Sequence, residues 1–186
     1  MDDDREELHF RRIDMRAFRR RDGLYEVEGR LTDRKPHDLC IEGHHRVVPA
    51  HEPMHDMGVR LVYDEQMTIL EVHTFTGAAP YRACPEGGRA LQAMVGASMT
   101  KGWTREVRAR LARDRSCTHL RDLLVPMATA AFQSLTMLRA AQPDRLDAHG
   151  RPLKIGSCFA YAEDGEVVRM RWPQFARDTP STGKPQ

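Results

Sequence analysis

Three short clusters carry the imidazole, thiol and carboxylate groups that bind metals or act as nucleophiles. The first cluster is His51-Glu52-Pro53-Met54-His55-Asp56-Met57, the second is Pro80-Tyr81-Arg82-Ala83-Cys84-Pro85, and the third is Ser116-Cys117-Thr118-His119. Each lies at the end of an expected strand or helix, where functional side chains are often displayed. Together the clusters could supply the ligands of a divalent metal, zinc or iron.

The candidate metal ligands are Asp56, Cys84 and Cys117, with His55 or His119 as the fourth ligand. Thiolate, imidazole and carboxylate donors together suit zinc before other metals, or iron. Cys117 also lies at the expected start of a helix, where unpaired backbone N–H groups favour the thiolate form. The chain contains neither a CxxC pair nor an HExxH motif, so the ligands of the predicted site would be dispersed.

The same residues also fit roles that need no metal. Both cysteines of these clusters could be small apolar core residues, and His55 could make a hydrogen bond at a strand edge. If a metal is bound, His51 could replace His55 as the nitrogen ligand. Cys40 lies in a His-rich loop and Cys158 in an expected strand, and neither has an assigned role.

Strands are predicted where apolar and polar residues alternate, over residues 24–32, 59–63 and 68–75. The short connection between the last two favours an antiparallel sheet. In a three-stranded meander, the start of the second strand and the end of the third lie at the same edge. That arrangement would bring His55 close to Cys84.

Helices are predicted over residues 89–95, 103–111 and 118–141, with a kink or break at a proline in the longest of them. The longest helix must lie across the sheet, because its Leu and Met side chains form one apolar face. Its first turn would then deliver Cys117 and His119 to the same edge of the sheet.

We therefore expect an α+β fold, with a three-stranded antiparallel sheet covered on one face by helices and a C-terminal β-hairpin. The hairpin would pair residues 154–159 with 166–171 around an Asp-Gly turn. Seven acidic and seven basic residues cancel within residues 1–22, which predicts a charged arm. Residues 23–175 would form a single domain, and residues 176–186 a flexible tail.

The composition excludes several classes of protein. With 186 residues, 29 basic and 27 acidic side chains and a formal net charge of +2, the chain is not expected to be a polybasic binder of nucleic acid or membranes. No apolar run approaches the ~18 residues of a membrane span. The N-terminal residues lack the apolar stretch of a secretory signal, so we do not expect a secreted protein. In a protein that is not secreted, four cysteines favour reduced thiols or a metal site over disulfides. We expect a cytoplasmic protein, and its oligomeric state stays open.

A basic stretch follows the second cluster. Residues 101–115 contain six basic and two acidic side chains, which could hold an anion such as a phosphate, a CoA moiety or nucleic acid. Such a run more commonly forms a solvated basic helix face. Apart from Trp103, the stretch has no aromatic side chains on which bases could stack.

Five stretches spread over nearly the whole chain are specific enough to suggest a family. They are RRDGLYEVEGRLTDRKP, PMHDMGVRLVYDEQMTI, AAPYRACP, GWTREVRARL and CTHLRDLLVPMATAAFQ. On these stretches the chain resembles a bacterial family known only as a domain of unknown function. The resemblance implies a bacterial source and carries no established activity.

Residues 55–138 are also similar in layout to the U-type iron–sulfur cluster scaffold proteins. In that family a Cys-Gly-Asp precedes a strand hairpin, a second Cys follows it, and a third Cys starts the long final helix. Here His55-Asp56 stands at the first position, and Cys84 and Cys117 stand at the second and third. His55 replaces a Cys and the intervening Gly is missing, changes that are compatible with a zinc or iron ion, and an iron–sulfur cluster stays open as the alternative cofactor.

The resemblance implies a cytoplasmic metal-binding protein of iron–sulfur scaffold or sulfur-transfer type, with a partner enzyme or a sulfur-donor protein. An alternative is a small metal-dependent enzyme acting on an anionic small molecule or an acyl thioester. In that case the metal keeps an open position, and Glu52 or the non-ligating histidine serves as acid–base partner. A second alternative is a metal-free interaction module.

Overall fold

The structure, a computed structural model of the chain, describes residues 4–41, 46–140 and 142–177. The chain forms two compact units, Met1–Thr136 and Met137–Gln186. Within the described residues, no helix is both long enough and apolar enough to cross a lipid bilayer.

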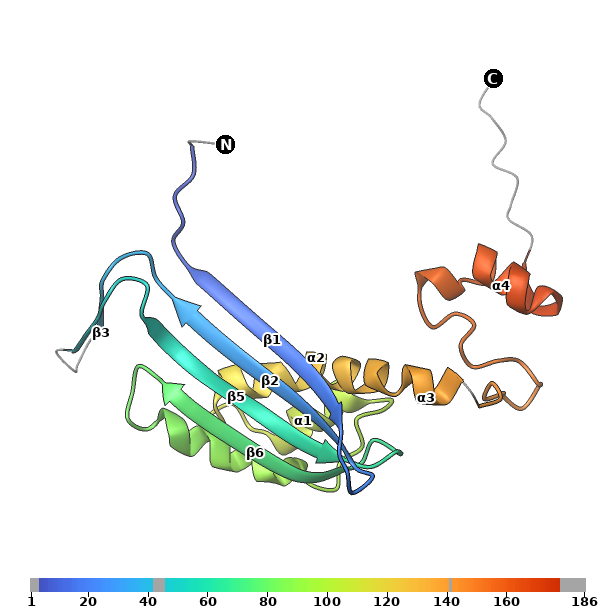
Figure 1. The fold of residues 1–186 in the computed structure, drawn as a ribbon, viewed down its shortest axis with the longest axis horizontal. Coiled ribbons are helices and arrows are strands. Elements are labelled where there is room, and N and C mark those ends of the chain that lie inside the picture. Colours follow the sequence, from blue (N-terminus) through green and yellow to red (C-terminus); the bar gives the residue numbers. More distant parts are fainter. Residues whose placement is uncertain (1–3, 42–45, 141, 178–186) are drawn as a thin grey trace. The chain divides into compact units, whose positions relative to one another are not determined.

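A four-stranded antiparallel sheet is the framework of the first unit (Figure 1). Its strands are β1 (Phe10–Arg19), β2 (Tyr25–Arg34), β5 (Pro53–Tyr63) and β6 (Ile69–Ala78), in the order β1-β2-β5-β6. Strands β2, β5 and β6 correspond to the three that the alternation of apolar and polar residues predicts. In β2 and β5 alternate residues are buried under the helices, whereas β6 buries only Ile69 and Val72.

The predicted three-stranded sheet is wrong, because β1 adds a fourth strand from within residues 1–22, the predicted charged arm. β1 pairs with β2 over its whole length and lies at the edge of the sheet. An edge strand tolerates many charged side chains because much of it stays in contact with water. Met15 and Ala17 nevertheless pack against the core.

A separate two-stranded sheet lies in the connection between β2 and β5, where the sequence predicts only a loop. It pairs β3 (Leu39–Ile41) with β4 (Arg46–Val48). Each of these strands has three residues and buries one side chain, too short a pattern for alternation to reveal.

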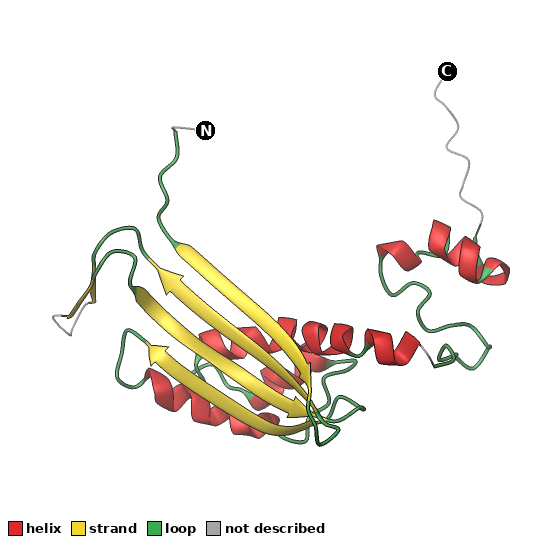
Figure 2. Cartoon of the chain, in the orientation of Figure 1, coloured by secondary structure: helices red, strands yellow, loops and turns green. Residues whose placement is uncertain are grey.

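Helices cover one face of the four-stranded sheet (Figure 2). They are the 3₁₀ helix η1 (Cys84–Met94) and the α-helices α1 (Trp103–Arg110) and α2 (Thr118–Ser134). Pro126 lies inside α2, which continues to Ser134, and a short helix α3 (Thr136–Ala140) follows.

The core lies between this sheet and these helices. The indole N–H of Trp103 donates a hydrogen bond of 2.8 Å to the carbonyl oxygen of Leu124, which ties α1 to α2. The largest buried side chains come from several elements, including Leu61 and Tyr63 of β5, Leu91 and Met94 of η1, and Leu120, Leu123 and Met127 of α2. This layered arrangement confirms the α+β class.

The predicted C-terminal hairpin is wrong. Its second strand is the helix α4 (Glu166–Arg171), and its first strand is irregular chain that leads into the short 3₁₀ helix η2 (Phe159–Tyr161). Val168 and Trp172 are both buried against Ile155. They are four residues apart, which is the spacing of a helix face and not that of an alternating strand.

The second unit ends in a 3₁₀ turn, η3 (Pro173–Phe175), and the predicted tail 176–186 lies almost entirely outside the described residues. The predicted single domain over 23–175 spans parts of both compact units.

Candidate metal centre

The helix-facing side of β2 ends on a charged residue. Tyr25, Val27, Gly29 and Leu31 are buried at alternate positions, and Asp33 continues the same series with no exposed surface. Because successive side chains of a strand point to opposite faces, Asp33 must point toward the helices. A carboxylate at such a position requires hydrogen-bond or ionic partners.

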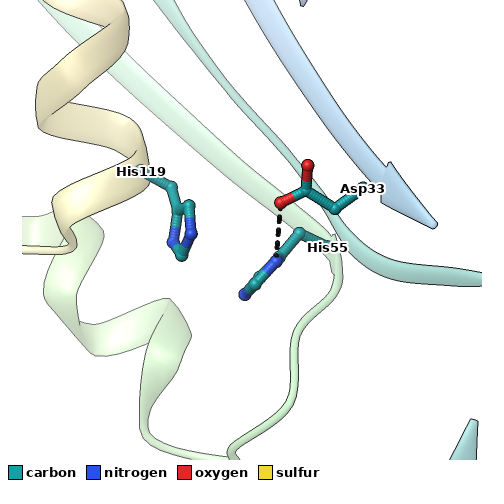
Figure 3. A group of neighbouring side chains, drawn as sticks. All are labelled: Asp33, His55 and His119. Carbon is teal, nitrogen blue, oxygen red and sulfur yellow. Dashed lines mark hydrogen bonds and ion pairs between the residues drawn. The ribbon is translucent and has the colours of Figure 1, made fainter. Parts of the chain in front are cut away.

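The first partner of Asp33 is His55 on β5. The two residues are paired directly across β2 and β5, and His55 is likewise buried on the helix-facing side. The Nδ1 atom of His55 lies 3.0 Å from Oδ2 of Asp33 (Figure 3). The pairing of two strands therefore sets this contact.

His119 reaches the same place from α2. It is the second residue of that helix and shares a face with Leu123 and Met127, which pack toward β2 beside Gly29. Eight helical residues span about 12 Å, and the four strand residues from Gly29 to Asp33 span about 13 Å. The packing of Met127 on Gly29 therefore brings His119 level with Asp33.

The rings of His55 and His119 face each other in Figure 3. Their centroids are 4.0 Å apart, and their planes are tilted by 40°. One ligand atom from each of Asp33, His55 and His119 lies within 4.8 Å of the other two. Among the described residues this is the only such group of histidine, cysteine and acidic side chains.

Strand β1 supplies a cation to the cluster. Arg11 pairs with Asp33 across the sheet, and its guanidinium donates from Nε to Oδ1 at 2.7 Å and from Nη2 to Oδ2 at 2.8 Å. His9 Nε2 lies a further 3.2 Å from Oδ1. Each carboxylate oxygen of Asp33 thus has two nitrogen atoms within hydrogen-bond distance.

The surroundings keep Asp33 ionised. Burial alone would raise the pKa of this carboxyl, but the hydrogen bonds and charge of Arg11, together with the contact to His55, outweigh burial and lower the pKa below its ordinary value. A buried carboxylate therefore persists at neutral pH.

Both histidines are held in the neutral form. Burial is the main cause that lowers the pKa of His55 from 6.5, followed by the nearness of His119, while Asp33 opposes the shift. Burial also lowers the pKa of His119, with Arg11 adding to the effect. A neutral imidazole has a free nitrogen lone pair, which both metal binding and proton transfer require.

The chemistry of the cluster suits a divalent metal. Ligand atoms that share one ion at about 2.0–2.1 Å are roughly 3.0–3.4 Å apart, depending on the coordination geometry. The separation of 3.0 Å between His55 Nδ1 and Asp33 Oδ2 fits two neighbouring ligands of one ion as well as it fits a hydrogen bond.

The structure brings His55 and His119 of the predicted ligands together and leaves the others outside the cluster. Asp56 follows His55 along β5 and therefore points to the other face, where Arg30 donates two hydrogen bonds of 2.7 Å to its carboxylate. Cys117 Sγ lies 3.8 Å from the sulfur of Met57, and Cys84 begins η1.

The remaining candidates also lie apart from the cluster. Cys40 and Cys158 are exposed, and all four cysteines are free thiols. His51 is exposed and has a positive φ of 66° in the connection before β5. Glu52 is exposed in the same connection.

Asp33, Arg11 and His9 are the residues at this site that sequence reasoning missed. The alternation that predicts the strand over residues 24–32 extends by one more step to Asp33, so the period itself places this carboxylate on the buried face. Arg11 carries no comparable signal, because the charges around it are dense and mixed.

Comparison with known proteins identifies a family and no close relative of known activity. No curated protein and no solved structure matches the chain. The family model DUF2889, described as a protein of unknown function, matches residues 9–133. This range includes every residue of the cluster, from His9 to His119. The chain therefore belongs to the family DUF2889 of proteins of unknown function.

Proposed function

We propose that this protein binds one divalent metal ion, zinc or iron(II), through Asp33, His55 and His119. The observation that carries the proposal is the convergence of these three side chains, from two paired strands and one helix, to within 4.8 Å of one another. Two imidazoles and one carboxylate are a common ligand set of catalytic zinc and of non-haem iron(II).

The proposed site has three protein ligands, which leaves coordination positions for water or substrate. Structural zinc sites are closed by four protein ligands, whereas catalytic sites keep a position open. We therefore infer a small metal-dependent enzyme rather than a protein with a structural metal. The metal would act as a Lewis acid or lower the pKa of a bound water molecule.

Two of the three proposed ligands are held in place by neighbouring residues. Arg11 fixes the Asp33 carboxylate through two hydrogen bonds, and the pairing of β2 with β5 fixes His55. Supports of this kind orient the ligands and tune their basicity. The free thiols of the chain fit a reducing compartment, so the cytoplasm remains our proposed location.

The iron–sulfur scaffold or sulfur-transfer role finds no support in this cluster. Iron–sulfur clusters are held mainly by cysteine thiolates. The cluster of Asp33, His55 and His119 contains no sulfur atom, and Cys117 lies against Met57 instead. The metal-dependent enzyme is therefore the better proposal.

A second candidate is a metal-free acid–base pair, and one observation favours it. If the atom between His55 Nδ1 and Asp33 Oδ2 is a proton, the carboxylate fixes the imidazole tautomer and leaves Nε2 as a base. The two candidates differ in whether a metal ion or a proton joins these two atoms.

Metal binding separates the candidates. The full chain, purified without a histidine tag and stripped with a chelator, is dialysed against Zn²⁺ or, without oxygen, Fe²⁺, and the bound metal is measured. We expect about one ion per chain, and at least ~100-fold weaker binding for His55→Gln and for His119→Gln. The matched control is His37→Gln, at an exposed position in the same unit.

Two outcomes would contradict the proposal that the protein binds a metal ion at this site. Wild-type protein that retains no more metal than the His55→Gln/His119→Gln variant contradicts the proposal. A low-field proton resonance of His55 Nδ1 in protein that takes up no zinc favours the metal-free pair.

A further inference from the structure

A second site of a different kind lies on another side of α2. A cavity of about 420 Å³ opens between α1, the segment that follows it and the first turns of α2. Arg121, which lines it, is two residues from His119, and two residues correspond to about 200° around a helix. The cavity and the metal centre therefore face nearly opposite directions.

Arg121 is the most enclosed cation of this cavity. Its side chain is 12% exposed, and its closest acidic partner is Asp122, at 3.7 Å from Nη2 to Oδ1. That distance is too long for a hydrogen bond. Within the described residues no buried side-chain nitrogen lacks a hydrogen-bond partner. Any nitrogen of Arg121 without a hydrogen-bond partner is therefore not fully buried, and this side chain lines the cavity.

Two further arginines line the same cavity. Arg108 projects from α1, and Arg113 lies in the segment between α1 and α2. In the part of the chain that the structure describes, no carboxylate lies within ion-pair distance of either guanidinium. Asp122 is the one acidic residue in the lining. Three cations and one anion leave about two positive charges without compensation.

Apolar side chains also line the cavity. Val107 and Leu111 belong to the core behind the cavity, and Val125 on α2 is 39% exposed. A ligand that fits must place an anionic group against the arginines and an organic group against these side chains. Cavities of a few hundred Å³ with such a mixed lining are of the size that binds small molecules.

We propose that this cavity binds a small phosphate ester, with its phosphate held by Arg108, Arg113 and Arg121. A phosphate monoester carries about −1.5 to −2 charges near pH 7, which matches the uncompensated charge better than a single carboxylate does. Guanidinium groups donate paired hydrogen bonds to phosphate oxygens. The ester's organic group lies against Val107, Leu111 or Val125. This site functions whether or not the other centre binds metal.

Calorimetric titration with phenyl phosphate tests the proposal on the full chain in the presence of a chelator, so that no bound metal contributes. We expect saturable binding, weakened at least ~10-fold in Arg121→Gln and in Arg113→Gln. Arg105→Gln is the matched control, because Arg105 is an exposed residue of α1 outside the cavity lining. Its affinity for phenyl phosphate should equal that of the wild type.

Two other probes test the two halves of the ligand. Benzoate should bind at least ~10-fold more weakly than phenyl phosphate, because it carries one charge. Inorganic phosphate should also bind more weakly, because it lacks the apolar group. Equal affinity of benzoate and phenyl phosphate overturns the assignment of a phosphate ligand. Equal affinity of inorganic phosphate and phenyl phosphate overturns the role of the apolar side chains.

Unchanged binding in both arginine variants, or no saturable binding of phenyl phosphate below ~10 mM, overturns the proposal as a whole. Arg113 is exposed, so Arg113→Gln keeps the test decisive even where Arg121→Gln does not fold.

Discussion

The backbone carbonyl of Gly87 accepts a hydrogen bond of 3.0 Å from the N–H of Cys117, the residue that precedes α2. This bond joins η1 to the start of α2 and fixes where that helix begins. His119 follows two residues later, so its distance from Asp33 and His55 depends on the same contact. A Cβ atom at position 87 would lie 2.8 Å from the Cys117 nitrogen.

The first prediction is that Gly87→Ala weakens metal binding without touching a ligand. Backbone atoms cannot accept a contact of 2.8 Å, so the start of α2 must shift and carry His119 with it. We expect zinc affinity to fall about 10-fold or more, as for other changes in the support of a ligand. Competition with a chelating dye measures the affinity, and a wild-type value would show that this contact does not position His119.

The second prediction concerns the ion pair of Arg11 and Asp33. Arg11→Met removes two hydrogen bonds from a fully buried carboxylate, and we expect the metal-free protein to lose about 1–3 kcal/mol of unfolding free energy. The partial exposure of Arg11 keeps the figure below that of a wholly buried pair. Arg12→Met, at an exposed residue of the same strand, is the control and should change stability by less than ~0.5 kcal/mol.

The third prediction follows from the same pair. Without Arg11, the negative charge of Asp33 is no longer neutralised by a cation of the protein, so a bound metal ion gains more from it. Zinc should therefore raise the melting temperature of Arg11→Met by more than it raises that of the wild type. An equal rise would contradict contact between the metal and Asp33, and a smaller rise would show that the orienting hydrogen bonds of Arg11 outweigh its competition for the carboxylate charge.

The fourth prediction is a dependence of stability on pH in the metal-free protein. The folded-state pKa values of His55 and His119 lie below 6.5, so as the pH falls through 6.5 the unfolded chain takes up protons that the folded chain does not. Their contribution is thus complete above the unfolded pKa and lost as the pH decreases, by up to about 1.4 kcal/mol per pH unit for each histidine.

Denaturant unfolding between pH 7.5 and 5.5 measures this slope. The variant His55→Gln/His119→Gln should show a flatter dependence of the free energy of unfolding on pH, and His37→Gln should keep the wild-type slope. Equal slopes in all three proteins would show that the two buried histidines are not held neutral by the fold.

The fifth prediction concerns the cysteines. Cys84→Ser/Cys117→Ser should retain the metal with an affinity within about threefold of the wild type, because neither thiol belongs to the cluster of ligands. Elemental analysis of the dialysed variant is sufficient. Loss of the metal in this variant would contradict the proposed ligands and favour Cys84 and Cys117, the thiolate ligands predicted from the sequence.

Much of the sheet could be predicted because its strands alternate cleanly. On β2, apolar residues at every second position predict a half-buried strand. β1 has the same alternation at Ile13, Met15 and Ala17, but charged residues fill the positions around them, namely Arg12, Asp14 and Arg16. Edge position, which tolerates those charges, is a property of the tertiary fold and cannot be read from the local pattern.

The candidate site was only partly predictable for a related reason. His55 and His119 were identified from their residue type and from their position at the ends of elements. Adjacent strand residues point to opposite faces, so His55 and Asp56 cannot both reach one site. This rule excludes Asp56 as a ligand, but only once it is known that β5 begins at Pro53 and therefore includes both residues. Asp33 and His55 are 22 residues apart in the sequence, so their pairing depends on the register between β2 and β5. That register is set by packing over the whole sheet.

X-ray absorption spectroscopy of the zinc-loaded protein tests the proposed metal centre most directly, because it reports which atoms contact the ion. We predict a coordination shell of nitrogen and oxygen at about 2.0–2.1 Å, with the outer scattering of two imidazole rings. Replacing His119 with glutamine should remove one imidazole contribution. A zinc–sulfur distance near ~2.3 Å, or a shell without histidine, would contradict a centre built from Asp33, His55 and His119.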